Sequence, residues 1–503
     1  MGAMIERVGG PAVRIPAGKL LINGQWCDGA EGRMIAVYDP ATEEKIGDLV
    51  AASAADVDRA VQAAHRTFES THWQKMRPLD RGRLLEKLAL LIERDAEELA
   101  RLETLDNGKP FGVSRNVDMK FAIDALRYYS GWSSKMAGEY IQLSPFFDDG
   151  GTYRAYTERR PVGVVGGITP WNFPLGQAVQ KLAPAIAFGC TVVLKPSEDA
   201  SLTTLRLGEL ILEAGIPEGA INIVTGYGYE AGQALVDHPL VRKIAFTGST
   251  FTGQKILATS ARHMKRVTLE LGGKSPTIIL ADADLDRAIP GAANAIFPNS
   301  GQVCTAGSRL LIEASIFDEV TKGVAQIARG LKLGSGFDPL VQLGPLISSR
   351  QLNRVSELVS TGIKDGAEPL CGGGQVVGKG YFYQPTVLTG GRSDMQIARE
   401  EVFGPVVLAM PVQNAGDIKA LANDTEYGLG ASIWTRDINK AHLLAAQLDC
   451  GTVWINTHNV LDLAMPFGGT KMSGLGREFG TEVIHAYTEP RAVCMRLETS
   501  AFD

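Results

Sequence analysis

The chain has 503 residues, of which 45% are hydrophobic and 21% are charged, and its formal net charge is −6 at pH 7. These values are typical of a globular protein of two or three domains, and the lack of basic excess argues against nucleic acid and anionic membranes as partners. The six cysteines show no zinc-like spacing and no run could cross a membrane, so we expect no metal and a cytoplasmic protein that binds small molecules.

The N-terminal part of the chain is predicted to be mostly helical after a short hairpin. Residues 1–20 lack the apolar core of a signal peptide and are expected to form a loosely ordered arm. Residues 19–26 have the pattern of a strand that turns back at Asn23 and Gly24. Apolar side chains then recur with helical spacing in three segments, residues 57–68, 84–92 and 114–136.

Two segments with strand-like alternation lie far apart in the chain. Residues 151–160 alternate in this way, and so do residues 493–498, where Val493, Met495 and Leu497 are the apolar members. The pattern is compatible with pairing inside one chain and with pairing between two copies.

Strands and helices alternate between residues 161 and 270, which is typical of a doubly wound parallel sheet covered by helices. A helix is predicted at residues 205–213, ending at Gly215. The predicted strands are residues 162–168, 191–194, 221–224, 244–246 and 267–269. This α/β arrangement typically binds nucleotides, although the Gly-x-Gly-x-x-Gly turn is missing after the first strand.

Another strand end could replace that turn. Gly248, Ser249 and Thr250 precede a helix predicted at residues 254–260. Free N–H groups and the helix dipole suit a pyrophosphate there, with the two hydroxyls as donors, although the pattern is also that of an ordinary N-cap.

Lys195 and Glu198 follow the second strand, where the adenine ribose of a dinucleotide would lie. A carboxylate at this place accepts from both ribose hydroxyls and repels a 2′-phosphate. Glu198 therefore favours NAD over NADP, while Lys195 could also meet that phosphate and keeps NADP possible.

A second α/β unit is predicted beyond Lys274. It has one strand at residues 309–313. Its helices are residues 282–297, interrupted near Pro290, and residues 316–331, 349–365 and 438–448.

Cys304 stands in a loop of small and polar residues. Such a loop gives a thiol the room that a nucleophile needs, and backbone N–H groups nearby can hold an oxyanion, although a lone cysteine is often buried and inert. Glu270 interrupts an apolar strand that runs into paired glycines. Burial would raise its pKa toward the range that suits a general base, unless the side chain faces water at a sheet edge.

Asn172 lies just past the first strand of the sheet. Its amide is an uncharged donor that could stabilise an oxyanion without quenching a thiolate, or it could cap the local turn.

The stretches around these residues resemble the active-site signatures of the NAD(P)-dependent aldehyde dehydrogenase superfamily. The two main matches are Leu269-Glu270-Leu-Gly-Gly-Lys-Ser-Pro276 and Gly301-Gln-Val-Cys304-Thr-Ala306. Further blocks follow the family's order from about residue 20 to the C-terminus. They are Thr169-Pro-Trp-Asn-Phe-Pro174, Lys195-Pro-Ser-Glu198, Phe246-Thr-Gly-Ser-Thr250, Glu400-Glu-Val-Phe-Gly-Pro405 and Pro466-Phe-Gly-Gly469.

The resemblance implies a division of the chain into domains. Residues 20–132 and 153–272 would form an NAD-binding domain, and residues 273–472 a catalytic domain. Residues 133–152 and 486–503 would be small β segments that build an oligomer, either a homodimer or a homotetramer.

The resemblance also implies roles for single residues. Cys304 would be the nucleophile, Asn172 and the Cys304 N–H would hold the oxyanion, Glu270 would be the base, and Glu478 would exchange protons with Glu270. The cofactor would be bound by Thr169, Pro170, Trp171, Lys195, Glu198, Gly248, Ser249, Thr250, Leu271, Glu401 and Phe403, of which Glu401 would hold the nicotinamide ribose. The aldehyde tunnel would be lined by Phe173, Gln177, Val303, Thr305, Leu461 and Phe467.

The predicted reaction is the oxidation of an aldehyde to a carboxylic acid with NAD through a cysteine thiohemiacetal and thioester. Residues 454–469 are similar to those of phenylacetaldehyde-type and other aryl or medium-chain aldehyde dehydrogenases, so an apolar aldehyde is expected. Two alternatives stay open: a cofactor-independent cysteine esterase or hydrolase using Cys304 and Glu270, and a non-catalytic binding protein on the same fold.

Overall fold

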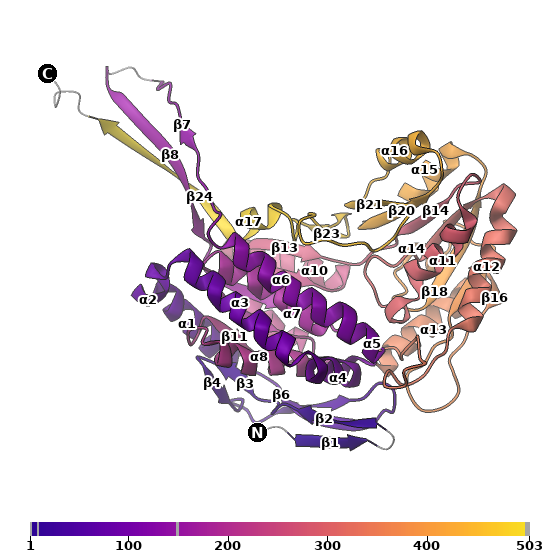
Figure 1. Ribbon diagram of the computed structural model, residues 1–503, viewed down its shortest axis with the longest axis horizontal. Helices are drawn as coiled ribbons and strands as arrows, with labels where there is room; N and C mark the ends of the chain where they lie inside the picture. Colours follow the sequence, from indigo (N-terminus) through magenta and orange to yellow (C-terminus); the bar gives the residue numbers. More distant parts are fainter. Residues whose placement is uncertain (1–2, 8–9, 147–149, 498–503) are drawn as a thin grey trace.

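The computed structural model describes residues 3–7, 10–146 and 150–497. Its strands form an eight-stranded sheet, a seven-stranded sheet and several small ones. Figure 1 shows the two large sheets in separate halves of the molecule, each with helices packed on it, and a narrow arm projecting from the first half. The predicted α/β class is confirmed.

The eight-stranded sheet contains the strands that the sequence predicts between residues 161 and 270. Its order is β23-β13-β12-β9-β10-β11-β3-β4, and the five central strands run parallel. The hairpin predicted at Asn23 is confirmed as the antiparallel pair β3–β4. The strands are β3 (Leu20–Ile22), β4 (Gln25–Cys27), β9 (Val164–Ile168), β10 (Thr191–Lys195), β11 (Ile221–Ile223), β12 (Val241–Thr247), β13 (Arg266–Glu270) and β23 (Gly474–Leu475).

Helices cover both faces of this sheet because its strands are apolar on both sides. Val192 and Leu194 belong to a core shared with α3, α4, α6, α7 and α8, whereas Val193 belongs to a second core shared with α1, α9 and α10. The helices are α1 (Ala54–Glu69), α2 (Thr71–Lys75), α3 (Pro78–Arg94), α4 (Ala96–Asn107), α5 (Phe111–Val113), α6 (Met119–Trp132), α7 (Pro174–Ala187), α8 (Leu202–Ala214), α9 (Gln233–Asp237) and α10 (Thr250–Ser260).

The predicted helices of this half are confirmed; the structure extends most of them, but the helix predicted at residues 114–136 already ends at Trp132. Ser53 caps α1 in a reciprocal capping box with Asp56. The helix expected from residue 114 begins with a π-helical turn, η1 (Ser114–Asp118), before α6. Among the described residues, no helix combines the length and apolar character that a bilayer crossing requires.

The seven-stranded sheet has the order β16-β17-β18-β15-β14-β20-β21. Its strands are β14 (Pro276–Ile279), β15 (Arg309–Glu313), β16 (Glu368–Cys371), β17 (Thr386–Thr389), β18 (Val406–Val412), β20 (Gly430–Trp434) and β21 (Thr452–Ile455). Its helices are α11 (Leu285–Ile296), α12 (Phe317–Gly330), α13 (Ser349–Lys364), α14 (Gln396–Arg399), α15 (Ala415–Asn423) and α16 (Ile438–Ala445). Pro290 lies inside α11, so the expected interruption near this proline is wrong.

The arm is a three-stranded antiparallel sheet of order β24-β8-β7. β8 (Thr152–Pro161) pairs along its whole length with β24 (Thr488–Leu497), which follows α17 (Glu482–Tyr487), and β7 (Tyr140–Ile141) flanks β8. The two alternating segments seen in the sequence therefore pair within one chain. The last predicted oligomerisation residues, 498–503, and residues 147–149 lie outside the described part of the chain.

The N-terminal segment forms strands, so the prediction of a loosely ordered arm is wrong for its described residues. β1 (Ala3–Arg7) pairs with β2 (Gly10–Ile15), while β5 (Met34–Tyr38) pairs with β6 (Lys45–Val50). Val13 and Ile15 are buried in the core of the first half. Long-range contacts of this kind leave no local periodicity for a sequence pattern to detect.

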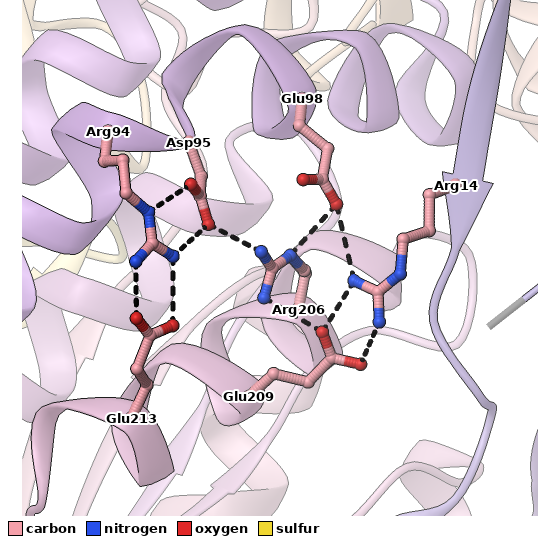
Figure 2. Close-up of polar contacts among 7 residues, drawn as sticks. All are labelled: Arg14, Arg94, Asp95, Glu98, Arg206, Glu209 and Glu213. Carbon is pink, nitrogen blue, oxygen red and sulfur yellow. Dashed lines mark hydrogen bonds and ion pairs between the residues drawn. The ribbon is translucent and has the colours of Figure 1, made fainter. Parts of the chain in front are cut away.

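An ion-pair network joins β2 to the helices α4 and α8 (Figure 2). Arg14 of β2 donates to both carboxylate oxygens of Glu209 on α8. Arg206, also on α8, contacts Asp95 at 2.6 Å, Glu98 at 3.1 Å and Glu209 at 2.9 Å. The network therefore links β2, α8 and the start of α4.

Candidate active site

Cys304 lies in the loop between α11 and β15, beyond a tight turn, η4 (Pro298–Gly301). Asn299 and Ser300 adopt left-handed backbone angles in this turn, with φ of 51° and 54°. Backbone strain of this kind concentrates at functional sites because surrounding contacts must hold it. The Cys304 side chain is half-buried, in contrast to the fully buried Cys190.

Burial raises the pKa of Cys304 to about 12, and the charges of Glu401 and Glu270 contribute to the rise. Backbone N–H groups of Cys304 and Thr305 act in the opposite direction. The thiol is therefore protonated at neutral pH in this arrangement, and a thiolate requires a base or an added positive charge.

Glu270 is the last residue of β13, and its side chain is 3% exposed. Neither of its carboxylate oxygens has a hydrogen-bond partner in the described chain. Burial, with the charge of Glu478 adding to it, raises its pKa well above the usual value. The predicted direction of this shift is confirmed, and the alternative of a carboxylate facing water at a sheet edge is wrong.

Asn172 joins the end of the eight-stranded sheet to the Cys304 loop. Its Nδ2 donates to Gln302 O at 3.0 Å, and its Oδ1 is buried without a partner among the residues that the structure describes. Asn299 Nδ2 donates to the Asn172 main-chain oxygen at 3.2 Å. The second amide hydrogen of Asn172 has no acceptor in these contacts, so it is free for a ligand.

Glu478 lies behind Glu270 in a closed polar cluster. It accepts hydrogen bonds from Gln180 Nε2 and Lys181 Nζ, both on α7. Lys181 Nζ also donates to Thr247 Oγ1 at 2.7 Å. Glu478 and Lys181 are buried, so these bonds are charge-assisted and shielded from water.

The ends of β9 and β10 present the residues predicted for the adenosine side of a dinucleotide. Lys195 Nζ donates to Glu198 Oε2 at 3.0 Å. Burial opposes ionisation of Glu198, but the Lys195 charge and backbone N–H groups outweigh it and lower the pKa of Glu198. Thr169 is buried at the end of β9, and its hydroxyl has no partner in the described chain.

The start of α10 forms the predicted N-cap. Ser249 accepts from Thr252 N at 3.3 Å, and Thr250 Oγ1 donates to Met472 O at 3.1 Å. Gly248 N–H is used by the Glu270 main-chain oxygen at 3.0 Å. The side chains of Ser249 and Thr250 and the Gly248 N–H thus have partners within the protein. The backbone N–H groups at the start of α10 that lack such partners could meet a phosphate.

Glu401 approaches the same region from the second half of the molecule. Its Oε1 accepts from Gly273 N at 3.0 Å, and burial raises its pKa to about 7. A Cβ at Gly272 would lie 2.5 Å from Glu401 Oε2, so a larger residue there would push the Glu401 carboxylate aside. Phe403 has a left-handed φ of 56°, and its ring lies edge-on to Trp171, 5.2 Å between ring centres.

The remaining cofactor residues lie on the same strand ends. Pro170 directly follows Thr169 and is half-buried, and Leu271 follows Glu270 and is buried. Leu271 N donates to Ser473 O at 2.9 Å. All predicted cofactor residues therefore lie at the carboxyl ends of β9, β10, β12 and β13 or on the facing loop, where open α/β sheets bind dinucleotides.

Aromatic side chains pack in one small cluster with Cys304. Phe467, Phe479 and Leu429 form a small cluster against which Phe121, Leu463 and Cys304 pack. Phe121 meets Phe479 edge to face at 5.8 Å between ring centres. Of the other predicted pocket residues, Phe173, Gln177 and Val303 are half-buried, Thr305 is buried, and Leu461 is exposed.

Two residues that the sequence analysis missed hold Thr305. His458 Nε2 lies 3.0 Å from Thr305 O, and its Nδ1 lies 2.9 Å from Ser432 Oγ. Burial lowers the pKa of His458 to about 4, so the ring is neutral, with the proton on Nε2. Thr305 Oγ1 donates to Asn459 Oδ1 at 2.6 Å. Both residues lie in the block 454–469 that the resemblance marks, but their contacts with Thr305 could not be predicted, because only the folded chain brings residues 305 and 458 together.

Residues 26–493 match the model of the aldehyde dehydrogenase family. The chain belongs to this family. Phenylacetaldehyde dehydrogenase from Pseudomonas fluorescens is 46% identical over 483 residues, covering 96% of each chain. Human retinal dehydrogenase 2 is 45% identical over 489 residues, 97% of this chain and 93% of the other.

A solved structure gives the same result. The NAD⁺ complex of an aldehyde dehydrogenase from Bacillus cereus superposes with a TM-score of 0.93 at 45% identity, over 96% of this chain and 97% of the other. As an aldehyde dehydrogenase, the chain is an oxidoreductase that acts on aldehydes. This membership does not favour the cysteine hydrolase or the non-catalytic binding protein.

Proposed function

We propose that this aldehyde dehydrogenase oxidises an apolar aldehyde to the carboxylic acid with NAD, through a thioester on Cys304. The observation that carries the proposal is Glu270, a buried carboxylate with no internal hydrogen-bond partner, whose charge acts on the Cys304 thiol. Burying a carboxylate without a hydrogen-bond partner costs folding free energy. Its presence here therefore supports a role in a reaction.

The residues around the strand ends fit NAD. Glu198 would accept from the adenine ribose hydroxyls, the start of α10 would meet the pyrophosphate, and Glu401 would accept from the nicotinamide ribose. The buried Thr169 hydroxyl, which has no partner in the described chain, supports a ligand at the end of β9. Bound NAD supplies a hydride acceptor and a positive ring, which would favour the thiolate.

The first step uses the thiol and the two oxyanion donors. Glu270 removes the proton of Cys304, and the sulfur forms a bond to the carbonyl carbon as the C=O π electrons move onto oxygen. Asn172 Nδ2–H and the Cys304 N–H donate to this oxyanion. The C=O bond re-forms when the hydride leaves the carbon, which gives the thioester.

The second step uses Glu270 as a general base. Once the proton taken from Cys304 has left Glu270, its carboxylate removes a proton from water, the oxygen of that water bonds to the thioester carbon, and the C–S bond breaks to release the acid and the Cys304 thiolate. Glu478 lies behind Glu270 and is held by Lys181, so this pair is suited to exchange the proton that Glu270 gains.

The aromatic cluster supports an aryl or medium-chain aldehyde such as phenylacetaldehyde. The Phe479 ring lies edge-to-face with Phe121 and tilted against Phe467, in the cluster that also contacts Cys304, and aromatic rings favour such contacts with a further ring. Phe173, Gln177, Val303, Thr305 and Leu461 would complete the tunnel. The relative named phenylacetaldehyde dehydrogenase, at 46% identity, supports the same substrate class.

The arm supports assembly with further copies. Tyr140, Tyr156, Met495 and Leu497 expose between 39% and 62% of their surface on it. A narrow sheet with exposed apolar side chains is unstable in water unless another surface covers it. A homodimer or homotetramer through residues 133–160 and β24 would cover these side chains, and the three-domain division proposed from the sequence has this arm as its oligomerisation part.

Replacement of the nucleophile tests the proposal. Cys304→Ala should abolish NADH formation from phenylacetaldehyde while NAD still binds, because the thiol touches the substrate and not the ribose. Cys450→Ala is the matched control, since this thiol lies in the second half of the molecule beside Asp449 and should leave the rate unchanged. Full NADH formation by Cys304→Ala would overturn the assignment.

A further inference from the structure

A buried ion cluster lies behind Asn172 and has no part in the steps above. Lys109, in the turn between α4 and α5, donates to Asp118 Oδ2 at 2.5 Å and to Glu103 Oε1 at 3.4 Å. All three side chains are at most 3% exposed. Such a cluster adds little to the free energy of folding, because the cost of desolvating the charges offsets their attraction. Stability alone therefore does not explain why these charges are buried here.

Lys109 also binds the main chain at Asn172. Its Nζ donates to Asn172 O at 2.8 Å and lies 4.3 Å from the centre of the Phe173 ring. Asn299 reaches the same carbonyl from the Cys304 loop. The Asn172 carbonyl is therefore fixed by a cation from the first half of the molecule and by an amide from the nucleophile loop.

The main chain on both sides of Asn172 is also held by hydrogen bonds, from Glu103 of the cluster and from Asn107. Glu103 Oε2 accepts from Leu175 N at 3.3 Å, in the first turn of α7, where the N-cap residue Phe173 offers no side-chain acceptor. A carboxylate at a helix N-terminus is favourable because it satisfies a free N–H and opposes the dipole. On the other side, Asn107 Nδ2 donates to Trp171 O at 2.8 Å.

We propose that Lys109, held in place by Glu103 and Asp118, is a positioning residue that sets the main chain at Asn172 so that its amide meets the oxyanion. The inference rests on the proposed function, because it requires Asn172 to hold that oxyanion. The side chain of Asn172 is attached to its Cα, which is bonded directly to the carbonyl group that accepts from Lys109. A displacement of about 1 Å at a reacting group can cost roughly a hundredfold in rate.

The test is the kinetics of Lys109→Met, which keeps the aliphatic stem and removes the donor. We expect kcat to fall by roughly tenfold to a hundredfold. The dissociation constant of NAD and the rate of Cys304 alkylation by iodoacetamide should stay unchanged, because neither process forms an oxyanion. Without Lys109 the Asp118 carboxylate loses its cation, so the single variant can fold poorly. In that case the same kinetics are measured on Lys109→Met/Asp118→Asn, in which this carboxylate is replaced by an amide.

Lys265→Met is the matched control. Lys265 is also a buried lysine, and its Nζ donates to a main-chain carbonyl, that of His238, remote from the Cys304 loop. Its kcat should equal that of the wild type. Unchanged kcat in Lys109→Met, or an equal loss in Lys265→Met, would overturn the positioning role.

The double variant Lys109→Met/Asn172→Ala separates this inference from the proposed function. If Lys109 acts through Asn172, the double variant should be as slow as Asn172→Ala alone, which should lose roughly a hundredfold to a thousandfold in kcat. Losses that multiply in the double variant would reject the inference and leave the proposed function standing. Full kcat in Asn172→Ala would reject the oxyanion assignment, and the inference with it.

Discussion

Glu270 is buried next to a second carboxylate, and both effects raise its pKa. A general base works only when deprotonated, so hydrolysis of the thioester should slow as the pH falls through this raised pKa. The same shift means that ionising Glu270 in the folded protein costs free energy, so its contribution to stability is lost as the pH rises.

Glu478→Gln should move the acid limb of the hydrolysis rate to lower pH. The substitution removes the neighbouring negative charge that raises the pKa of Glu270. The measurement is the single-turnover rate of acid release between pH 5 and pH 9. Glu482→Gln, an exposed carboxylate on α17, should leave the limb in place. A limb that moves upward in Glu478→Gln would contradict this account of Glu270.

Glu198 sets the expected preference for NAD. Its carboxylate, paired with Lys195, would meet the 2′-phosphate of NADP as a like charge. Glu198→Gln should raise kcat/KM for NADP relative to NAD by roughly tenfold or more. The neighbouring Asp199→Asn is the control, because Asp199 pairs with Arg350 at 2.7 Å, and the ratio should not change there. An unchanged ratio in Glu198→Gln would rule out this role.

At the scale of elements, the network of Figure 2 holds β2 and α8 together. Arg206 is 8% exposed and contacts three half-buried carboxylates, so Arg206→Met would remove the buried guanidinium that they share. We expect a loss of about 2 kcal/mol in the free energy of unfolding, measured by urea denaturation. Arg94→Met removes an exposed arginine of the same network and should leave that free energy nearly unchanged. Equal losses in both variants would show that burial does not decide the effect.

The elements that the sequence predicted well have strong local signals. α1 shows apolar periodicity behind a Ser53 cap, and β10 and β13 are apolar runs between turns. β2 was missed because its stability comes from Arg14 and from side chains buried against distant helices. Pro290 was misjudged as a break, although the helix continues through it.

The same distinction applies to the candidate site. Cys304 and Glu270 stand in unusual local surroundings, a polar loop and an interrupted strand, so their chemistry could be predicted from nearby residues. Lys109 and His458 could not, because a lysine after a helix and a histidine after a strand carry no signal until the fold places them against Asn172 and Thr305.

At the scale of the whole molecule, the site lies where the two halves meet. β13 of the first half provides Glu270, the second half provides Cys304 and Glu401, and Asn172 of the first half donates to Gln302 O of the second. The predicted domain limits and the cytoplasmic location stay predictions.

We propose that the arm joins copies of the chain. Removal of residues 488–503 would leave β8 without the partner strand that pairs along its whole length. We expect this truncation to convert the dimer or tetramer to monomers in analytical ultracentrifugation. Met495→Glu/Leu497→Glu keeps the strand and places charge on its exposed side chains, so it should also weaken assembly. An unchanged sedimentation coefficient in both variants would contradict the role of the arm.

The most direct test of the whole account is a single-turnover experiment with Glu270→Gln, NAD and phenylacetaldehyde. We expect a burst of at most one NADH per subunit, followed by arrest, with the phenylacetyl mass found on the peptide that contains Cys304. Continued NADH formation at the wild-type rate, or an acyl group on any other residue, would contradict it.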